Sequence, residues 1–371
     1  MAATTPVDRR VADLVMRLMV DDFGNAGSRT HSMGTAAKTT VERAREQLAR
    51  VVDCQPNEVI FTSGATEADN LATLGLHEFA LKTKRMHIVS TSIEHKAILE
   101  PLEHLAEHGF EVTFVNPQAS GVVEASDILK QVRDDTVLVS VMHVNNETGV
   151  IQPLDAIALG LQDHPCFLHT DAAQGFGKVL NPLTNRRIDM VSVSGHKFFA
   201  PKGIGALIVR RRGVDPLPLS PLAFGGGQES GLRPGTIPVA LVAGLGLAAE
   251  IALAEHDERQ ERVMELAHRI EAFTLENDGQ INGDRSRCAP NIINVAFRGL
   301  DSEAFIVATK HLVAVSNGAA CSSHAYSHSH VLEAMNLEPW RVRGAIRFSF
   351  SHDSVFPDEK LLQKAIQLAR F

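Results

Sequence analysis

A lysine with a serine and a histidine close by is the first feature of this sequence that could do chemistry. Lys197 ends the run Ser194-Gly195-His196-Lys197, which follows an apolar, strand-like stretch at residues 188–193. A lysine amine at the end of a strand can condense with the aldehyde of pyridoxal phosphate, and small polar neighbours can hold the phosphate. Most lysines are solvated surface groups, so this segment alone leaves both interpretations open.

A second segment joins a strand to the start of a helix. Residues 59–61 are apolar and lead through Thr62-Ser63-Gly64 into a helical pattern that begins near Thr66. Backbone N–H groups at a helix start attract phosphate, and a hydroxyl there adds a donor. An ordinary strand-to-helix turn capped by Thr66 would have the same sequence.

Asp171 and His95 each follow an apolar strand. Asp171 closes the run 167–171, so its carboxylate is expected at the carboxyl edge of the sheet, where α/β proteins bind ligands. An aspartate there can pair with a pyridinium nitrogen and keep it protonated, although a helix N-cap is the alternative. His95 follows the run 87–91 at the same edge, where it could stack on a flat ring and move protons, or serve a structural role.

The elements that would position these residues alternate between strand and helix. Strand-like runs lie at 59–63, 87–91, 111–116, 137–144, 167–171, 188–194 and 205–210, and helical patterns at 66–82, 96–108 and 153–163. Such alternation predicts an α/β fold with a mostly parallel sheet that is covered on both faces. Residues 225–238 are rich in Gly and Pro and are expected to form a loop before a long helix over 239–276.

The last third of the chain has a different pattern. Strands are expected at 291–297, 312–316 and 345–350, and helices at 301–311, at 328–336 and from 357 onward. This order fits a smaller α+β domain. We therefore predict a large α/β domain at residues 12–252 and a small domain made of residues 1–11 and 253–371.

Composition narrows the class of protein. A chain of 371 residues suggests two domains, and 44% hydrophobic with 22% charged residues is ordinary for a globular protein. A net charge of −8 predicts no direct nucleic-acid binding, which usually needs a basic face. The apolar stretch 237–253 contains a proline and a glutamate, so it predicts a buried helix and no membrane span.

Cysteine and histidine usage gives no sign of a metal site. The cysteines, Cys54, Cys166, Cys288 and Cys321, show neither ligand spacing nor a disulfide framework, which favours a reducing, cytoplasmic location. Three histidines fall within residues 324–330, but no carboxylate or cysteine pair completes a ligand set there. A polar loop is the preferred interpretation of that tract.

Taken together, these segments resemble the cysteine desulfurases of the NifS/IscS type, which are fold-type I, class V aminotransferase-like enzymes. Eleven blocks match in family order, at residues 3–8, 23–25, 62–67, 94–96, 143–149, 171–174, 194–197, 225–229, 233–236, 316–321 and 347–349. The resemblance implies the PLP-dependent transferase fold of type I, with a seven-stranded, mostly parallel sheet in the large domain and a smaller α+β domain. Most relatives begin with a short strand before the first block, and the sequence leaves open whether this chain has one.

The resemblance also implies a role for individual residues. Lys197 is the Schiff-base lysine, Asp171 pairs the ring nitrogen, Gln174 pairs the ring hydroxyl, and His95 stacks on the ring and transfers protons. The other implied cofactor contacts are Ala65, Thr66, Ser194 and His196 at the phosphate, Asn146, and Thr236 at the phosphate of a neighbouring subunit. The last of these implies an obligate homodimer. The implied ligands of the substrate carboxylate are Asn146 and Arg347, with Asn25 assisting.

Cys321 is the implied nucleophile and carrier of a persulfide. It follows Gly318-Ala319-Ala320, a run of small residues, so we expect it to be exposed, whereas Cys166 lies in an apolar strand. A free thiol is only a few per cent thiolate at neutral pH, so a neighbouring group would have to activate it. We expect residues 317–330 to be mobile, because Cys321 must reach first the substrate sulfur and then an acceptor.

Other activities remain open at this stage. A selenocysteine lyase shares the fold and cofactor, a class V aminotransferase would not need Cys321, and a catalytically silent protein of the same fold could act as a scaffold. The segment around Cys321 favours the desulfurase. The expected partners are L-cysteine, a second copy of the chain and a sulfur-acceptor protein whose identity the sequence does not give.

Overall fold

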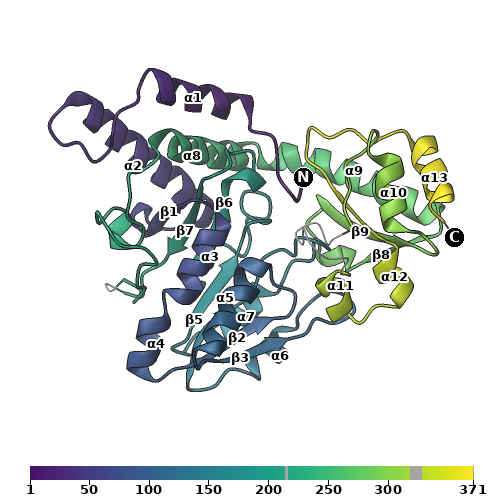
Figure 1. Ribbon diagram of the computed structural model, residues 1–371, viewed down its shortest axis with the longest axis horizontal. Helices are drawn as coiled ribbons and strands as arrows, with labels where there is room; N and C mark the ends of the chain where they lie inside the picture. The colour runs from purple at the N-terminus through teal and green to yellow at the C-terminus, as the bar shows by residue number, and fades with distance from the viewer. Residues whose placement is uncertain (214–215, 318–327, 371) are drawn as a thin grey trace.

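Two lobes, each built on its own β-sheet, make up the molecule (Figure 1). The computed structural model describes residues 1–213, 216–317 and 328–370. Within these residues the large lobe holds a 7-stranded sheet in the order β1-β7-β6-β5-β4-β2-β3. The strands are β1 Val59–Thr62, β2 His87–Thr91, β3 Glu111–Val115, β4 Thr136–Ser140, β5 Phe167–Asp171, β6 Met190–Ser194 and β7 Gly205–Val209.

The large sheet is mostly parallel, as predicted. β2 pairs in parallel with β3 and β4, and the parallel ladder continues through β5 to β6. Only β7 runs the other way, because it pairs antiparallel with both β6 and β1. The carboxyl ends of β1, β2, β5 and β6 therefore meet at one edge, and the predicted site residues follow these four ends.

Helices cover both faces of this sheet. Its apolar strand residues alternate between two cores, with Ile60 facing one and Phe61 the other. The large lobe contains α1 Arg9–Val20, α2 Ser32–Val52, α3 Ala65–Leu74, α4 His77–Thr83, α5 Lys96–Glu107, α6 Ala125–Leu129, α7 Leu154–Gly160 and α8 Val239–Ala254. α3 and α5 pack on the Ile60 side, and α2 and α8 on the Phe61 side.

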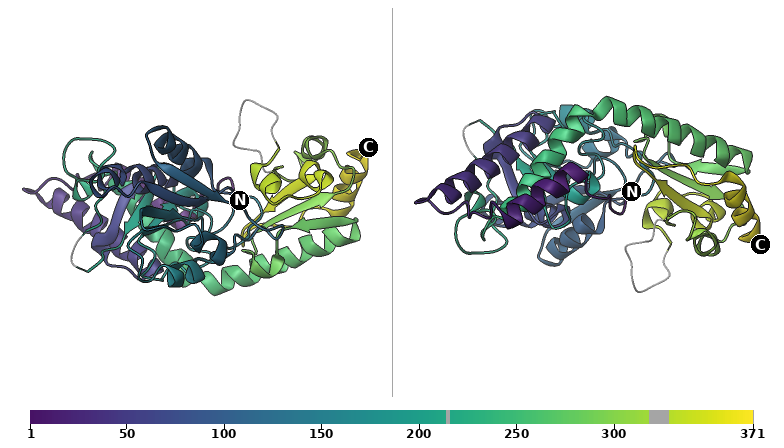
Figure 2. Two further views of the ribbon diagram at one scale, coloured as in Figure 1. Left: turned by 90° about the horizontal axis from the view of Figure 1, so that it is seen from below. Right: turned by 90° about the horizontal axis from the view of Figure 1, so that it is seen from above.

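Two predicted helices are each divided in the structure. The pattern at 66–82 forms α3 and α4, which separate at Gly75, a residue that weakens a helix. The pattern at 239–276 forms α8 and α9 His256–Glu276, whose axes differ by 74°. Glu255 lies at the bend, where its carboxylate pairs with Arg10 and Arg259. Figure 2 shows the second of these green helices running along the small lobe.

Membrane-spanning potential is low in the described ranges. No single helix there is long and apolar enough to cross a bilayer. The bent pair α8 and α9 passes the test of length and composition only when taken together, and most residues of α8 are buried in the protein.

The small lobe has an antiparallel sheet in the order β10-β9-β8 and a core of its own. Its elements are β8 Gly279–Asn282, β9 Ile292–Phe297, α10 Ser302–Thr309, α11 His330–Ala334, α12 Pro339–Arg343, β10 Ala345–Ser349 and α13 Glu359–Leu368. The strand predicted at 312–316 is wrong, because only Ser316 pairs, in an isolated bridge with Arg347. The boundary drawn at residues 252 and 253 stays a prediction.

Candidate active site

Lys197 lies at the carboxyl edge of the large sheet, one turn after β6. The 3-10 turn Gly195–Lys197 carries it away from the strand. Its Nζ donates hydrogen bonds to the carbonyl oxygens of Ala2, at 2.6 Å, and Ala3, at 2.9 Å. The N-terminal segment is thus part of the site, and sequence reasoning gave it no role although residues 3–8 matched the family.

The start of α3 lies beside this lysine turn. α3 begins at Ala65, and its N-cap is Gly64 with no side-chain hydrogen bond, so the alternative of a Thr66 cap is wrong. A Cβ placed on Gly64 would lie 3.8 Å from the Ser194 hydroxyl. The first N–H groups of a helix have no intrahelical acceptor, so Ala65, Thr66 and Ser194 present donors to one small region.

His196 completes this donor cluster. Its Nδ1 lies 3.1 Å from the Thr4 hydroxyl, and its backbone oxygen accepts the Thr5 N–H at 2.8 Å. Burial and the nearby Lys197 lower the pKa of His196 to about 4. The ring is therefore neutral at pH 7, so it can form a hydrogen bond to an anion without adding charge.

Asp171 and Gln174 lie at the end of β5, and both are buried. Asp171 Oδ1 accepts the Ala173 N–H at 2.8 Å, but no helix follows, so the N-cap alternative is wrong. Burial raises the pKa of Asp171, whereas the neighbouring His95 and Lys197 favour its charged form. Gln174 Nε2 donates to the Ala2 oxygen at 2.9 Å, and its buried Oε1 has no hydrogen-bond partner.

His95 has a structural role at the start of α5, and its predicted chemical role stays a prediction. It is the N-cap of α5, and its Nδ1 accepts the Ala97 N–H at 3.1 Å. Half-buried at the sheet edge, it also lies close enough to Asp171 to affect that carboxylate. The cap fixes the ring beside Asp171, so the two interpretations do not compete.

Arg347 and Asn146 meet across the two lobes. Arg347 comes from β10, and its Nη1 donates to the backbone oxygen of Asn146 at 2.8 Å. Next to them lies Glu147, a buried carboxylate that sequence reasoning missed. It accepts a hydrogen bond from Ser329, and burial raises its pKa to about 7 while Arg347 and His95 oppose the shift.

Two predicted residues, Asn25 and Thr236, are not brought into this cluster, and the position of Cys321 is not tested. Cys321 and the other residues of 318–327 lie outside the described residues. The mobility expected of this loop therefore stays a prediction. Ser316 pairs with Arg347 before that segment, and Ser329 bonds Glu147 after it, so the site holds both flanks. Asn25 and Thr236 are exposed and make no hydrogen bond or ion pair with the described site residues. The connection from α1 to α2, which carries Asn25, lies at the outer end of the large lobe (Figure 1).

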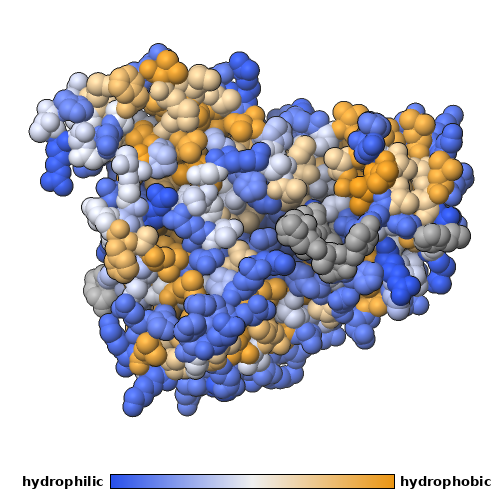
Figure 3. Space-filling view, in the orientation of Figure 1, coloured by the Kyte–Doolittle hydropathy of each residue, from blue (hydrophilic) through white to orange (hydrophobic). Residues whose placement is uncertain are grey.

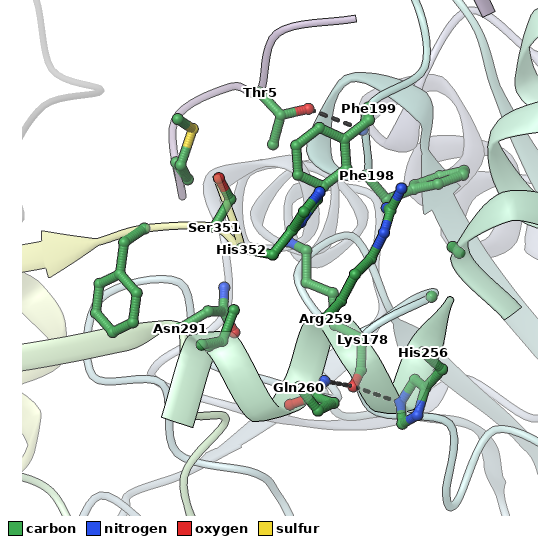
Figure 4. A pocket seen from close by; sticks show the side chains of 15 residues that line it. Thr5, Lys178, Phe198, Phe199, His256, Arg259, Gln260, Asn291, Ser351 and His352 are labelled. Carbon is green, nitrogen blue, oxygen red and sulfur yellow. Dashed lines mark hydrogen bonds between the residues drawn. The ribbon is translucent and has the colours of Figure 1, made fainter. Parts of the chain in front are cut away.

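A pocket that is open to solvent lies next to the lysine turn, between the lobes (Figure 4). Lys178, Phe199, Arg259 and His352 are among its lining residues, and the described residues predicted for the site are not. The Lys178 amine is buried without a hydrogen-bond partner. Burial, with help from Lys197, lowers the pKa of Lys178 to about 7.

The residues at the sheet edge fit pyridoxal phosphate. The start of α3 with Ser194 and His196 offers donors to a phosphate, and Asp171 offers a carboxylate to a ring nitrogen. The buried Oε1 of Gln174 has hydrogen-bonding capacity to spare. A lysine amine between these groups can hold an aldehyde, and Arg347 can take a carboxylate.

Comparison with known families supports this interpretation along the whole chain. A family model described as aminotransferase class-V matches residues 1–358. The chain is 42% identical over 372 residues to the cysteine desulfurase IscS of Escherichia coli O139:H28, an alignment that covers 100% of this chain and 90% of the relative.

Several solved structures resemble this chain in both fold and sequence. DndA from Streptomyces lividans is 49% identical, with a TM-score of 0.83 over 96% of this chain and 99% of that one. A NifS-like protein is 33% identical, with a TM-score of 0.89 over 99% and 97% of the two chains. SspA in complex with cysteine is 35% identical, with a TM-score of 0.84 over 95% and 98%.

Proposed function

The chain belongs to the aminotransferase class-V family, and we infer that it acts as a pyridoxal phosphate-dependent cysteine desulfurase in which Lys197 holds the cofactor. The observation that carries this conclusion is the meeting of Lys197, Asp171 and the α3 start at one sheet edge. When bound there, the cofactor supplies an electron sink for the substrate's α-carbon. The protein supplies placement, protons and a nucleophile.

Each cluster of side chains has a separate task in this proposal. Ser194, His196 and the first N–H groups of α3 bind the phosphate, and Asp171 stabilises a proton on the ring nitrogen. His95 lies against the ring and moves protons. Arg347 orients the substrate through its carboxylate, while the Asn146 carbonyl holds the guanidinium in place.

Cys321 is the proposed sulfur carrier. Its thiolate attacks the sulfur of the bound L-cysteine, the carbon–sulfur bond breaks, and the carbon skeleton gains a proton and leaves as L-alanine. The balanced result is one alanine and one persulfide on Cys321. The thiols elsewhere in the described chain are poor nucleophiles, because burial raises the pKa of Cys54 to about 12 and that of Cys288 to about 11.

Three results would test the activity. The purified protein should absorb in the visible region when loaded with cofactor, and reduction with borohydride should fix the label on Lys197. Incubation with L-cysteine and a thiol reductant should give equal amounts of alanine and sulfide. Lys197→Ala should lose both the fixed label and the products, while Lys82→Ala, an exposed lysine of α4, should keep them.

The alternative activities give different results in the same assay. A selenocysteine lyase would release selenide from selenocysteine while leaving L-cysteine intact. An aminotransferase would consume a keto acid and would be insensitive to Cys321→Ser. A silent scaffold would give no product from either amino acid.

We also propose that the working enzyme is a homodimer. The loop that carries Thr236 is tied to its own chain by Arg233, whose Nε lies 3.0 Å from Glu67 Oε1. Thr236 itself is exposed, in position to serve a second site. A second copy is also indicated by α1, which packs on α8 and leaves Met16, Met19 and Phe23 at least half exposed. Figure 3 shows this apolar face at the upper left, over α1.

Sedimentation analysis tests the dimer. The wild-type chain should sediment as a dimer, whereas the double variant Met19→Asp and Phe23→Asp should sediment as a monomer that retains cofactor poorly. A monomeric wild-type enzyme with full activity would disprove the dimer while leaving the desulfurase assignment intact.

The proposal also includes a sulfur-acceptor protein, because the persulfide needs a recipient. It includes a cytoplasmic location, because a reducing compartment keeps the Cys321 thiol from forming a disulfide.

A further inference from the structure

A second buried carboxylate lies behind Asp171. Asp69, on α3, is fully buried, and neither of its carboxylate oxygens has a hydrogen-bond partner. Its nearest basic group is His169, whose Nε2 lies 3.6 Å from Asp69 Oδ1. His169 precedes Asp171 by two residues on β5, so both side chains point to the face of the sheet that α3 covers.

Among the described residues, no cation acts on Asp69 to balance a negative charge. The groups that act on it are the carboxylates of Asp171 and Glu94 and the Ser192 hydroxyl. His169 is neutral, because burial lowers its pKa to about 3. Its ring nitrogens are occupied by two hydroxyls, with Nδ1 2.9 Å from Ser140 Oγ and Nε2 3.0 Å from Ser192 Oγ.

A carboxylate in such a place is unstable as an ion. Burying an unpaired charge is unfavourable, and a like charge nearby makes it more so. Burial and Asp171 both raise the pKa of Asp69 well above its usual value. Because each ionised carboxylate disfavours the other, the pair is expected to keep a proton on one of its two members.

The contacts decide which of the two carries that proton. Asp171 accepts the Ala173 N–H and lies near Lys197 and His95, and these groups favour its ionised form. Asp69 has none of these contacts: only the Ser192 hydroxyl, which also meets His169 Nε2, favours its ionised form. The proton therefore resides on Asp69.

We propose that Asp69 is a positioning residue for Asp171: it stays protonated as a neutral acid, and so leaves Asp171 as the ionised partner of the pyridine nitrogen. This inference rests on the proposed place of Asp171 at that nitrogen. In this proposal α3 has two tasks: its first turn offers N–H groups to the phosphate, and Asp69, one turn further on, carries the proton.

Infrared difference spectroscopy of the holoenzyme tests the proton directly. The spectrum of the wild type minus that of Asp69→Asn at pH 7 should contain the carbonyl stretch of a protonated carboxylic acid. The control Asp134→Asn removes an exposed aspartate and should give an ionised carboxylate signal instead. An ionised signal for Asp69 would overturn the proposal, and since it needs only folded protein, it does so whether or not the desulfurase assignment holds.

A second measurement tests the effect on Asp171. With cofactor labelled with nitrogen-15 in its ring, Asp69→Asn, which keeps a neutral polar side chain there, should keep the wild-type chemical shift. Asp69→Leu replaces that polar group with an apolar one, so the buried charge of Asp171 becomes more costly and the shift should move toward that of unprotonated pyridine. An unchanged shift in a folded Asp69→Leu enzyme would show that Asp69 has no influence on Asp171. If Asp69→Leu does not fold, a displaced shift in Asp69→Asn still counts against the proposal. A wild type that binds no cofactor would instead refute the proposed function.

Discussion

A structural hydrogen bond holds His95 where the proposed function needs its ring. Its Nδ1 caps α5 through the Ala97 N–H, which fixes the ring beside Asp171. A structural role is therefore no argument against a chemical one, since the same hydrogen bond that stabilises the helix also orients the imidazole.

Two substitutions of His95 separate the roles. Asparagine is a good N-cap, so His95→Asn should keep the free energy of unfolding within about 0.5 kcal/mol of the wild type. His95→Ala loses the cap and should cost about 1 kcal/mol. Both variants should lose alanine production by about 10²-fold or more, because neither can transfer the proton. Urea unfolding and an alanine assay measure the two effects. Wild-type turnover in His95→Asn would show that the ring takes no part in the reaction.

The buried amine of Lys178 makes the stability of the protein depend on pH, independently of the reaction. Its folded-state pKa is about 7, against 10.5 for the ordinary amine. Between pH 7 and about 10.5 the Lys178 amine is protonated in the unfolded chain and neutral in the folded chain. The free energy of unfolding therefore falls as the pH drops from about 10.5 to 7. Lys178→Met removes the penalty and should stabilise the protein by about 1–3 kcal/mol at pH 7, with the gain vanishing near pH 10.

Denaturation at several pH values measures this gain. The exposed Lys202→Met is the control and should lack the stability gain at pH 7 that is expected of Lys178→Met. If Lys178→Met were no more stable than the wild type at pH 7, the amine would have to be paired with an anion in solution.

At the scale of elements, the sequence predicted the large sheet well. Each of its strands is a short apolar run, such as residues 137–140, and such runs fit a strand buried on both faces. Prediction failed where pairing decides the outcome. The apolar residues 312–316 form no strand, because only Ser316 pairs with another segment. The polar β8, Gly-Gln-Ile-Asn, is a strand because it pairs with β9.

The turn before α3 depends on close packing at Gly205. A Cβ there would lie 2.3 Å from the Val193 oxygen and 2.6 Å from Gly64 Cα. Gly205→Ala should therefore destabilise the protein by about 1–3 kcal/mol and loosen the phosphate end of the site. Denaturation and the rate of cofactor loss on dialysis measure both effects.

Gly109 supplies the matched control for this prediction. A Cβ at Gly109 meets open space, although its φ of +92° is costly for alanine. Gly109→Ala should lose about 1 kcal/mol of stability and keep the cofactor. Equal cofactor loss in both variants would show that Gly205 has no special part in the turn.

At the scale of the whole molecule, the site lies where distant segments meet. Motifs identified Lys197, Asp171 and the α3 start, because each follows a strand end. They could not show that the carbonyls of Ala2 and Ala3 hold the lysine, or that Glu147 and Asp69 lie close by, since those contacts depend on tertiary packing. Buried carboxylates carry no local sequence signal.

The central claim is that Lys197 and Cys321 together take sulfur from L-cysteine. Mass spectrometry of the cofactor-loaded protein, treated with L-cysteine and then alkylated without reductant, tests it most directly. The wild type should carry one additional sulfur atom, on Cys321 and not on Cys54, Cys166 or Cys288, and Lys197→Ala should carry none. A persulfide on another cysteine, or one that forms in Lys197→Ala, would contradict the account.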